Sequence, residues 1–391
     1  MARGMFQGQR LSKVFVRLAY AAGTLSVILL RPIMAAEPEL AAPGNQTRAS
    51  ANILTPAEWR RLDGAVDRGL AFLASKHRAD GSFETIDGGQ PGVTSLCVMA
   101  FLSRGHLPGQ GPYGQQLSRA IDFTLSMQKP SGLFWTQEYR LPQRGGIGIY
   151  NHGISGLMLT EVYGMTDARQ QERIRAAIPK AIALTRHYQL GRKTNPTDKG
   201  GWRYLNMRRY RNSDVSSTSW QVMFLRSARN AEFDVPKQYI DEAVTYVKRS
   251  FKHRKRVFEY PLHGRDYVSA GVMGGGIVTL VLGGEHQSKI ARHAGDWVLS
   301  QNFNNYNRTR HRYERYHYSA FYCSQAMFQL GGEYWAQFYP QLMRTLIANQ
   351  NSDGSWQPEG QKDAEFGNIY TSALAILALT PPYQLLPIYQ R

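Results

Sequence analysis

Apolar residues recur along this chain in two kinds of segment that alternate with each other. The first kind is amphipathic, with apolar residues at helical spacing, as in Leu62, Val66, Leu70 and Leu73. The second kind is apolar on nearly every side and rich in Gly, Ala and Ser, which is typical of a helix enclosed by its neighbours. We therefore predict amphipathic outer helices and apolar inner helices.

Each kind of segment occurs six times. The predicted outer helices are Trp59–Ser75, Gln115–Met127, Gln171–Tyr188, Lys237–Phe251, Lys289–Gln301 and Tyr334–Asn349. The predicted inner helices are Thr94–Leu102, Asn151–Tyr163, Ser216–Ala228, Val268–Leu282, Tyr318–Leu330 and Tyr370–Leu379. Serines at matching places in the inner helices are 60, 64, 50, 50 and 53 residues apart, which indicates a repeat of one helix pair with a long loop.

The six pairs can continue as an open solenoid or close into a ring. An open solenoid needs polar capping repeats at its ends, and no such repeat is evident in the sequence. We therefore predict an all-α fold, an (α/α)6 toroid of six outer–inner helix pairs that forms a single domain over residues 55–391.

The first residues have the pattern of a secretory signal. Arg10, Lys13 and Arg17 precede an apolar run at 18–30, and the small residues Ala35 and Ala36 follow it. Thirteen residues are too few for a membrane span, which needs about 20. We predict a signal peptide at 1–36, a linker at 37–54 and export to the periplasm or the exterior; an uncleaved membrane anchor is the alternative.

Composition narrows the class of protein further. With 42% hydrophobic and 19% charged residues in 391, the chain has enough apolar material for a folded core. Two cysteines exclude a disulfide scaffold and any zinc module that needs four thiolates. Lys and Arg total 47 against 29 Asp and Glu, a net charge of +18 that favours anionic partners.

A motif in the last loop resembles that of a known superfamily. The segment Gln350-Asn351-Ser352-Asp353-Gly354-Ser355-Trp356 is similar to the glutamine–tryptophan repeat of the squalene cyclase and prenyltransferase repeat superfamily. Partial versions recur after the earlier outer helices, at Asp80-Gly81-Ser82-Phe83, at Gln128 with Gly132, Phe134 and Trp135, at Gly200-Gly201-Trp202, and at Trp297-Val298 with Gln301. The resemblance implies the toroid fold and a structural role for the motif.

The chemistry known for that superfamily is missing from this sequence. No two aspartates are adjacent, so the Asp-x-Asp-Asp acid of the cyclases and the Asp-Asp-x-x-Asp magnesium motif of terpene synthases are both absent. Asn151-His152-Gly153-Ile154-Ser155-Gly156-Leu157 resembles the His-containing inner helix of protein prenyltransferases, but Cys97 and Cys323 lack the accompanying Asp. We predict no metal and no cofactor, and we expect both cysteines to be buried and unbridged.

Residues just before each inner helix are the candidate site, because in a toroid these loops gather at one end. The catalytic candidates are His317, Tyr316, Tyr318, His152, Asp214 and Asp266. The candidate ligand-binding residues are Tyr150, Asn151, Tyr210, Tyr267, Tyr370, Arg209, Arg211 and Arg312. For Asp214 and Asp266 the alternative is an ordinary helix N-cap, and for His152 and His317 a buried structural role.

Three functions stay open. The first is binding of a hydrophobic, isoprenoid-like ligand, with small residues such as Gly271, Gly274, Gly275 and Gly276 beside its chain and arginines at an anionic head group. The second is an extracytoplasmic enzyme acting on an acidic polysaccharide, with Tyr316, His317, Tyr318, His152 and Asn151 moving protons. The third is a structural module of an envelope complex; nucleic acid is not an expected partner, because the protein is predicted to be exported.

Overall fold

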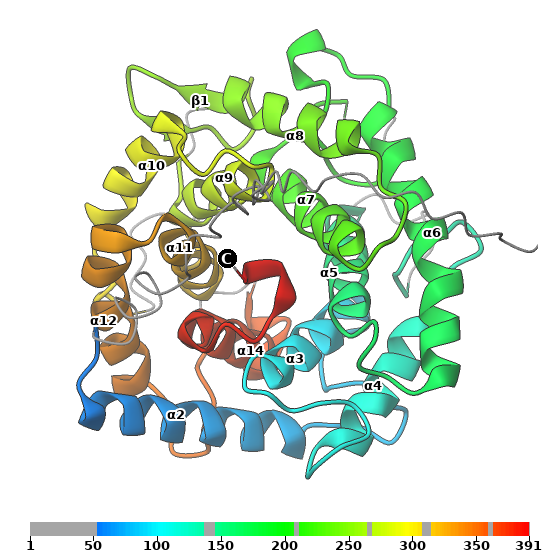
Figure 1. Ribbon diagram of the computed structural model, residues 1–391, viewed down its shortest axis with the longest axis vertical. Helices are drawn as coiled ribbons and strands as arrows, with labels where there is room; N and C mark the ends of the chain where they lie inside the picture. The colour runs from blue at the N-terminus through cyan, green and yellow to red at the C-terminus, as the bar shows by residue number, and fades with distance from the viewer. Residues whose placement is uncertain are drawn as a thin grey trace, which may run out of the picture. The chain divides into compact units, whose positions relative to one another are not determined.

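Helices in two concentric rings make up the part of the chain that the computed structural model describes, residues 53–136, 145–206, 211–263, 268–306, 314–358 and 363–390 (Figure 1). The outer ring consists of α2 (Pro56–Ser75), α4 (Gly114–Ser126), α6 (Ala168–Leu190), α8 (Lys237–Ser250), α10 (Lys289–Leu299) and α12 (Gly332–Ala348). The inner ring consists of α3 (Gly92–Leu102), α5 (Gly145–Glu161), α7 (Val215–Asn230), α9 (Ala270–Leu282), α11 (Tyr316–Leu330) and α14 (Gly367–Leu379). The predicted (α/α)6 toroid is confirmed.

The inner ring is closed. Each inner helix packs against the next, and the last, α14, packs against both α11 and α3. Every residue of α3 and of α9 is buried, as expected for helices with neighbours on all sides. Hydroxyl groups link neighbouring inner helices, for example Ser95 Oγ to Ser155 Oγ at 3.1 Å and Thr160 Oγ1 to Ser227 Oγ at 2.7 Å.

The outer ring is closed by the glutamine–tryptophan motif. Gln350, which follows α12, donates from Nε2 to the carbonyl oxygen of Ala65 in α2 at 2.8 Å and to that of Gly354 at 2.9 Å. Trp356 is fully buried and donates from Nε1 to the carbonyl oxygen of Leu346. The motif therefore ties the last outer helix to the first.

The same contact recurs between other outer helices. Gln128 donates to the carbonyl of Ala177 in α6, and Gln189 donates to the carbonyl of Tyr239 in α8, at 2.9 and 2.8 Å. The turn glycines Gly81, Gly132, Gly200 and Gly354 each have φ near +90° and each lies against a backbone carbonyl of the next outer helix. A Cβ at any of these four positions would lie 2.2–2.4 Å from that oxygen, so only glycine fits.

Glycines of the inner helix α9 also serve packing. A Cβ at Gly274 would lie 2.7 Å from the backbone of Tyr322 in α11, and one at Gly271 or Gly276 would meet the rings of Tyr318 or Phe258. Cys97 and Cys323 are free thiols and fully buried. Gly271, Gly274 and Gly276 let α9 approach its neighbours closely. All three are buried, so they offer no surface to a ligand.

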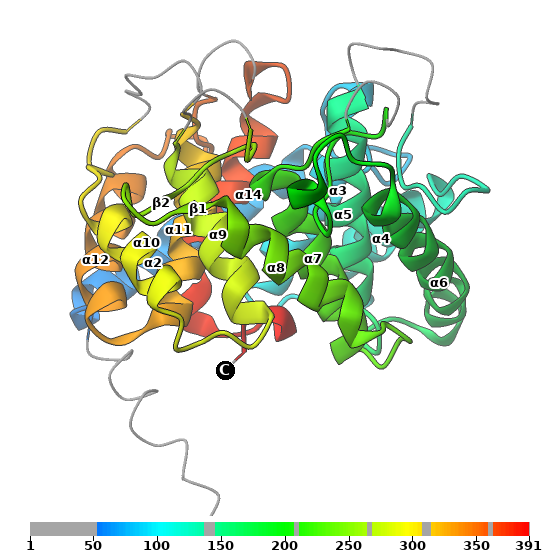
Figure 2. The ribbon, with the colours of Figure 1, turned by 90° about the horizontal axis from the view of Figure 1, so that it is seen from above.

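The C-terminal segment covers one end of the inner ring. After α14 the chain runs through two short 3-10 helices, η3 (Pro381–Tyr383) and η4 (Pro387–Tyr389), and its end lies under the rings in Figure 2. Ile388 and Tyr389 are buried, and Gln329 of α11 donates to the carbonyl of Tyr389 at 2.8 Å. The Ile388 amide donates to Glu161 of α5 at 3.0 Å, so a buried carboxyl group holds this cover in place.

The only sheet within the described residues is a two-stranded antiparallel hairpin of β1 (Phe251–Lys252) and β2 (Val257–Phe258), between α8 and α9 along the chain. Short 3-10 helices η1 (Asp87–Gly89) and η2 (Pro196–Asp198) lie in two of the loops. Among the described residues no helix is long and apolar enough to cross a bilayer. The signal predicted at 1–36 and the linker up to residue 52 lie outside the described residues.

The closure of the outer ring predicts unequal effects of two glycine substitutions. Gly354 and Gly164 have the same φ of +89°, but a Cβ at Gly164 would meet open space whereas one at Gly354 would collide with the Arg68 carbonyl. We expect Gly164→Ala to cost ~1 kcal/mol of unfolding free energy for its backbone conformation. Gly354→Ala should cost about 1–3 kcal/mol more, measured by urea unfolding. Equal losses would show that the close approach does not stabilise the ring.

The C-terminal cover predicts a pH dependence. Burial raises the pKa of Glu161 above its ordinary value of 4.5 to about 7. Between pH 4.5 and 7 the unfolded chain then loses this proton while the folded chain keeps it, so stability falls as pH rises, by about 3 kcal/mol in total. The Glu161→Gln variant keeps the shape of the side chain and has no group that titrates at this position. Its unfolding free energy should therefore fall less between pH 4.5 and 7. Parallel curves for the variant and the parent would contradict this role.

Candidate functional site

A chain of hydroxyl groups joins three inner helices where those helices begin. Tyr150 of α5 donates to Ser216 Oγ of α7 at 3.1 Å, and Ser216 Oγ lies 2.6 Å from the hydroxyl of Tyr318 in α11. Both tyrosines are half-buried as residues. Burial raises the pKa of both phenols above the ordinary value of 10, and they therefore stay protonated and act as hydrogen-bond donors and acceptors at neutral pH.

A buried ion pair stands beside this chain. Asp214 is fully buried immediately before α7, and its Oδ2 lies 3.1 Å from a terminal nitrogen of the Arg203 guanidinium. The same carboxylate caps α7: Oδ1 accepts from the Ser217 amide at 2.6 Å, and Oδ2 accepts from Ser217 Oγ at 2.9 Å. Asp214 is thus both the N-cap that the sequence offered as an alternative and the counter-ion of an arginine.

Two tyrosines hold the Arg203 guanidinium between them. The guanidinium carbon lies 4.5 Å from the ring centre of Tyr204 and 4.9 Å from that of Tyr260, and the two hydroxyls are 2.9 Å apart. The Arg203 side chain is only 14% exposed. Its Nε is buried and donates to no acceptor among the described residues, so the aspartate and the two tyrosine rings are what hold the guanidinium in place.

A second arginine–aspartate pair also lies near the hydroxyl chain. Arg315, just before α11, is 2.6 Å from Asp363, which is buried. Arg315 interacts electrostatically with Tyr370, Tyr150 and Tyr318, and its side chain is 37% exposed. We define the tyrosine–arginine cluster as Tyr150, Arg203, Tyr204, Asp214, Ser216, Tyr260, Arg315, Tyr318 and Asp363.

Aromatic side chains fill the inner ring beside this cluster. Trp220 of α7 stacks on Phe321 of α11, with ring centres 5.4 Å apart and planes 8° from parallel, and it meets the Tyr322 ring edge-on. All three are fully buried, and Tyr389 of the C-terminal cover reaches Met223 from the other end. These apolar side chains are therefore packed against one another, whereas Tyr150 and Tyr318 stay half-buried.

The predicted histidine of α5 lies outside the cluster. His152 is fully buried, with Nε2 2.9 Å from Thr185 Oγ1 of the outer helix α6 and Nδ1 accepting from the Phe134 amide at 3.4 Å. Burial lowers its pKa to about 4, so it is neutral. Neighbouring Asn151 accepts from the Gly92 amide and donates to the Gly88 carbonyl, which joins α5 to the start of α3. The structure gives both residues structural partners.

The three consecutive candidates at the start of α11 separate in space. Tyr316 donates to the Phe303 carbonyl at 2.7 Å, and His317 Nε2 lies 3.2 Å from the Tyr306 hydroxyl. Both residues are buried against the segment that follows α10, away from Tyr318. Of the five members of the predicted catalytic set that the structure describes, Tyr318 and Asp214 lie in the cluster, and Tyr316, His317 and His152 do not.

The remaining predicted residues fall in several places. Tyr150 is in the cluster, Tyr370 is half-buried near Arg315 with its ring against Phe366, and Arg211 is exposed on a loop. Outside the described residues lie Asp266, Tyr210, Tyr267, Arg209 and Arg312.

The predicted set omitted Arg203, Tyr204, Ser216, Tyr260, Arg315 and Asp363. The positions of three of these residues could have identified them from the sequence. Arg203 and Tyr204 directly follow the buried Gly-Gly-Trp motif, and Arg315 directly precedes α11.

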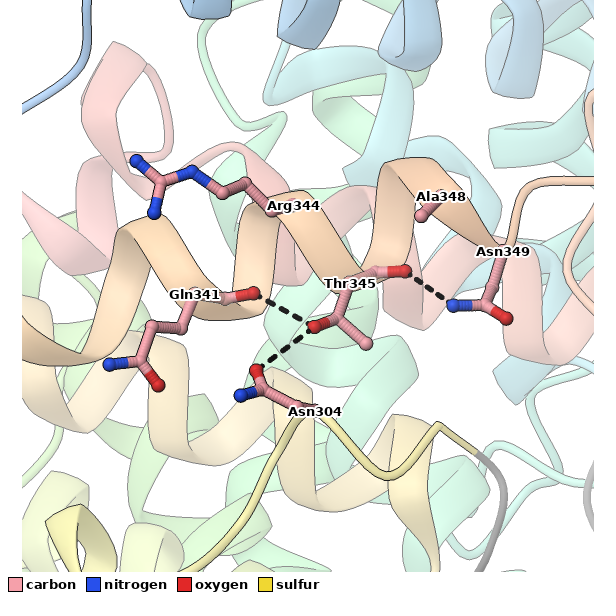
Figure 3. Close-up of a pocket in the computed structure, with 6 residues that line it drawn as sticks. All are labelled: Asn304, Gln341, Arg344, Thr345, Ala348 and Asn349. Carbon is pink, nitrogen blue, oxygen red and sulfur yellow. Dashed lines mark hydrogen bonds between the residues drawn. The ribbon is translucent and has the colours of Figure 1, made fainter.

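A separate pocket lies on the outer ring. It has a volume of about 360 Å³ and is lined by Asn304, Gln341, Arg344, Thr345, Ala348 and Asn349 (Figure 3). Thr345 Oγ1 already bonds Asn304 and the Gln341 carbonyl, and Arg344 pairs with Glu58 of α2. The pocket is open to solvent and its polar groups are largely engaged, so the tyrosine–arginine cluster is the better candidate site. Within the described residues, no group of three or more His, Cys, Asp and Glu side chains is arranged to hold a metal ion.

The double role of Asp214 predicts a large loss of stability on truncation. Asp167 is a matched control, since it caps α6 through the Gln170 amide but is exposed and has no arginine partner within the described residues. We expect Asp167→Ala to cost ~1 kcal/mol of unfolding free energy. Asp214→Ala should cost about 3 kcal/mol or more, because it also leaves Arg203 buried and unpaired. If Asp214→Ala costs no more than Asp167→Ala, Asp214 stabilises the protein only as a helix cap.

Comparison with known proteins gives the fold and leaves the chemistry open. No protein-family model matches the sequence, and neither does any curated protein sequence. Among solved structures, the type II terpene cyclase MstE from Scytonema, in complex with its substrate geranylgeranyl dihydroxybenzoate, is 14% identical with a TM-score of 0.56, over 85% of this chain and 100% of that one. The GH76A α-1,6-mannanase from Salegentibacter is 12% identical with a TM-score of 0.56, over 83% and 99%. A glycosidase in complex with glucose is 12% identical with a TM-score of 0.55, over 85% and 100%. The chain therefore has the α/α-toroid fold that terpene cyclases and these glycosidases share.

Proposed function

We propose that the tyrosine–arginine cluster is a saccharide-binding site. The observation that carries the proposal is the joining of four tyrosine hydroxyls, a serine hydroxyl and two arginine–aspartate pairs at one half-buried end of the inner ring. Sugar hydroxyls both donate and accept hydrogen bonds, and the C–H faces of sugar rings pack on aromatic rings. A surface of alternating donors, acceptors and ring faces matches both properties.

The charge balance of the cluster favours a ligand rich in hydroxyls. Each guanidinium already has a buried carboxylate partner, so the pairs need no anion from a ligand to neutralise them. The exposed part of Arg315 still offers directed donors. A uronic acid would bring a carboxylate to the site. The arginines predicted to line the same loops would then strengthen the binding of that ligand.

The packing of the inner ring also favours a saccharide. Trp220, Phe321 and Tyr322 are fully buried against one another, so these three rings offer no apolar surface to a ligand. Sugars bind at shallow aromatic surfaces, whereas a long apolar chain gains most of its binding energy from enclosure. Tyr150 and Tyr318 stay protonated, so their neutral hydroxyls can exchange hydrogen bonds with the hydroxyls of a sugar.

An isoprenoid-like ligand is the second candidate, because a toroid of the same fold binds geranylgeranyl dihydroxybenzoate. Its polar head would occupy the tyrosine–arginine cluster. Export through the signal predicted at 1–36 is part of either proposal, since it would bring the site to envelope or external ligands.

The experiment measures the binding of neutral manno- and gluco-oligosaccharides, uronate oligosaccharides and geranylgeraniol. Each ligand is titrated into the parent protein and into the Tyr318→Phe variant. Loss of the hydroxyl should weaken saccharide binding about tenfold with little change in unfolding temperature. Tyr334→Phe is the control, since its hydroxyl bonds Asp296 on the outer ring and lies away from the site. Binding that is equal in the two variants, or confined to geranylgeraniol, would contradict the saccharide proposal.

A further inference from the structure

A strongly basic hairpin projects from the outer ring. Residues 248–259 contain six Lys or Arg and one acidic residue, Glu259. The tip of the hairpin, His253-Arg254-Lys255-Arg256, is exposed at all four positions. Figure 1 places β1 at the outer edge of the rings, between α8 and α10. None of residues 248–259 belongs to the tyrosine–arginine cluster, so the hairpin is a separate feature of the surface.

The base of the hairpin is apolar and fixed. Phe251 and Phe258 are register partners, their ring centres are 5.1 Å apart, and both are buried. The Phe258 ring also covers Gly276 of α9. At the tip, the amides of Lys255 and Arg256 donate to the Lys252 carbonyl at 3.1 and 2.8 Å, so the turn itself is hydrogen-bonded. An ordered base thus presents the basic tip to solvent.

Part of this charge is used within the protein, and part is not. Lys252 pairs with Glu259 at 3.2 Å within the hairpin, and Arg256 pairs with Asp296 of α10 at 2.8 Å, which ties the turn to the ring. Arg254 at the tip pairs with no carboxylate in the part of the chain that the structure describes. On α10, Arg292 is exposed one helical turn before Asp296 and adds positive charge beside the hairpin.

We propose that the hairpin tip docks on the anionic phospholipid headgroups of a bilayer. A convex tip of long cationic side chains fits a flat surface of fixed negative charge, to which each nearby Lys or Arg adds affinity. Both phenylalanines of the hairpin are buried, so contact at the headgroup level needs no insertion into the hydrocarbon. Contact with a flat bilayer also needs no exposed aromatic face, and the exposed residues of the tip, 253–256, include no Phe, Tyr or Trp.

The test is sedimentation with lipid vesicles. Residues 44–391 are used, because they form one compact unit and omit the apolar run at 18–30, which would bind any bilayer. Arg254→Ser with Lys255→Ser is compared with Arg60→Ser with Arg61→Ser. The second pair removes the same charge from an exposed site on α2, on the opposite side of the ring.

The parent should bind vesicles of equal parts phosphatidylglycerol and phosphatidylcholine, and binding should weaken as salt rises. The hairpin variant should lose at least about tenfold in affinity, and the α2 variant about twofold or less. Circular dichroism spectra should stay unchanged in both. Equal losses in the two variants, equal binding of the parent to pure phosphatidylcholine, or no binding by the parent would each overturn the proposal.

Discussion

The close approach of each turn to the next outer helix is the contact on which the toroid depends. A glutamine amide reaches a backbone carbonyl across that gap, and a glycine in the left-handed region leaves room for it. The pairing of Gln350 with Ala65 joins residues 285 positions apart and converts a row of helix pairs into a ring. Ala65 lies in the middle of α2, so its carbonyl accepts this amide in addition to its bond within the helix.

Ring closure decides what can meet at the site. Ser216 and Tyr318 are 102 residues apart, yet their oxygens lie 2.6 Å from each other because α7 and α11 both flank α9. Closure also buries Trp220 of α7 against Phe321 of α11, while Tyr150 and Tyr318 stay half-buried. The fold alone does not select a reaction, since its neighbours include a terpene cyclase and glycosidases.

The periodic pattern predicted the fold, but only part of the site could follow from it. Alternating amphipathic and apolar segments specify the two layers, and their predicted bounds agree with the helices to within a few residues at most ends. A helix that is apolar on all sides does not reveal which residue faces inward. One residue turns the helix by about 100°, which is enough to point Tyr318 into the cluster and His317 against Tyr306. Arg203 was harder still to predict, because its aspartate partner lies across a loop.

The central claim is that the tyrosine–arginine cluster holds a saccharide, and native mass spectrometry of the protein purified from the organism that makes it tests this most directly. The account predicts a retained species with the mass of hexose or uronate units, reduced in the Tyr318→Phe variant and unchanged in Tyr334→Phe. A retained species with the mass of an isoprenoid lipid, or a saccharide held equally by both variants, would contradict it.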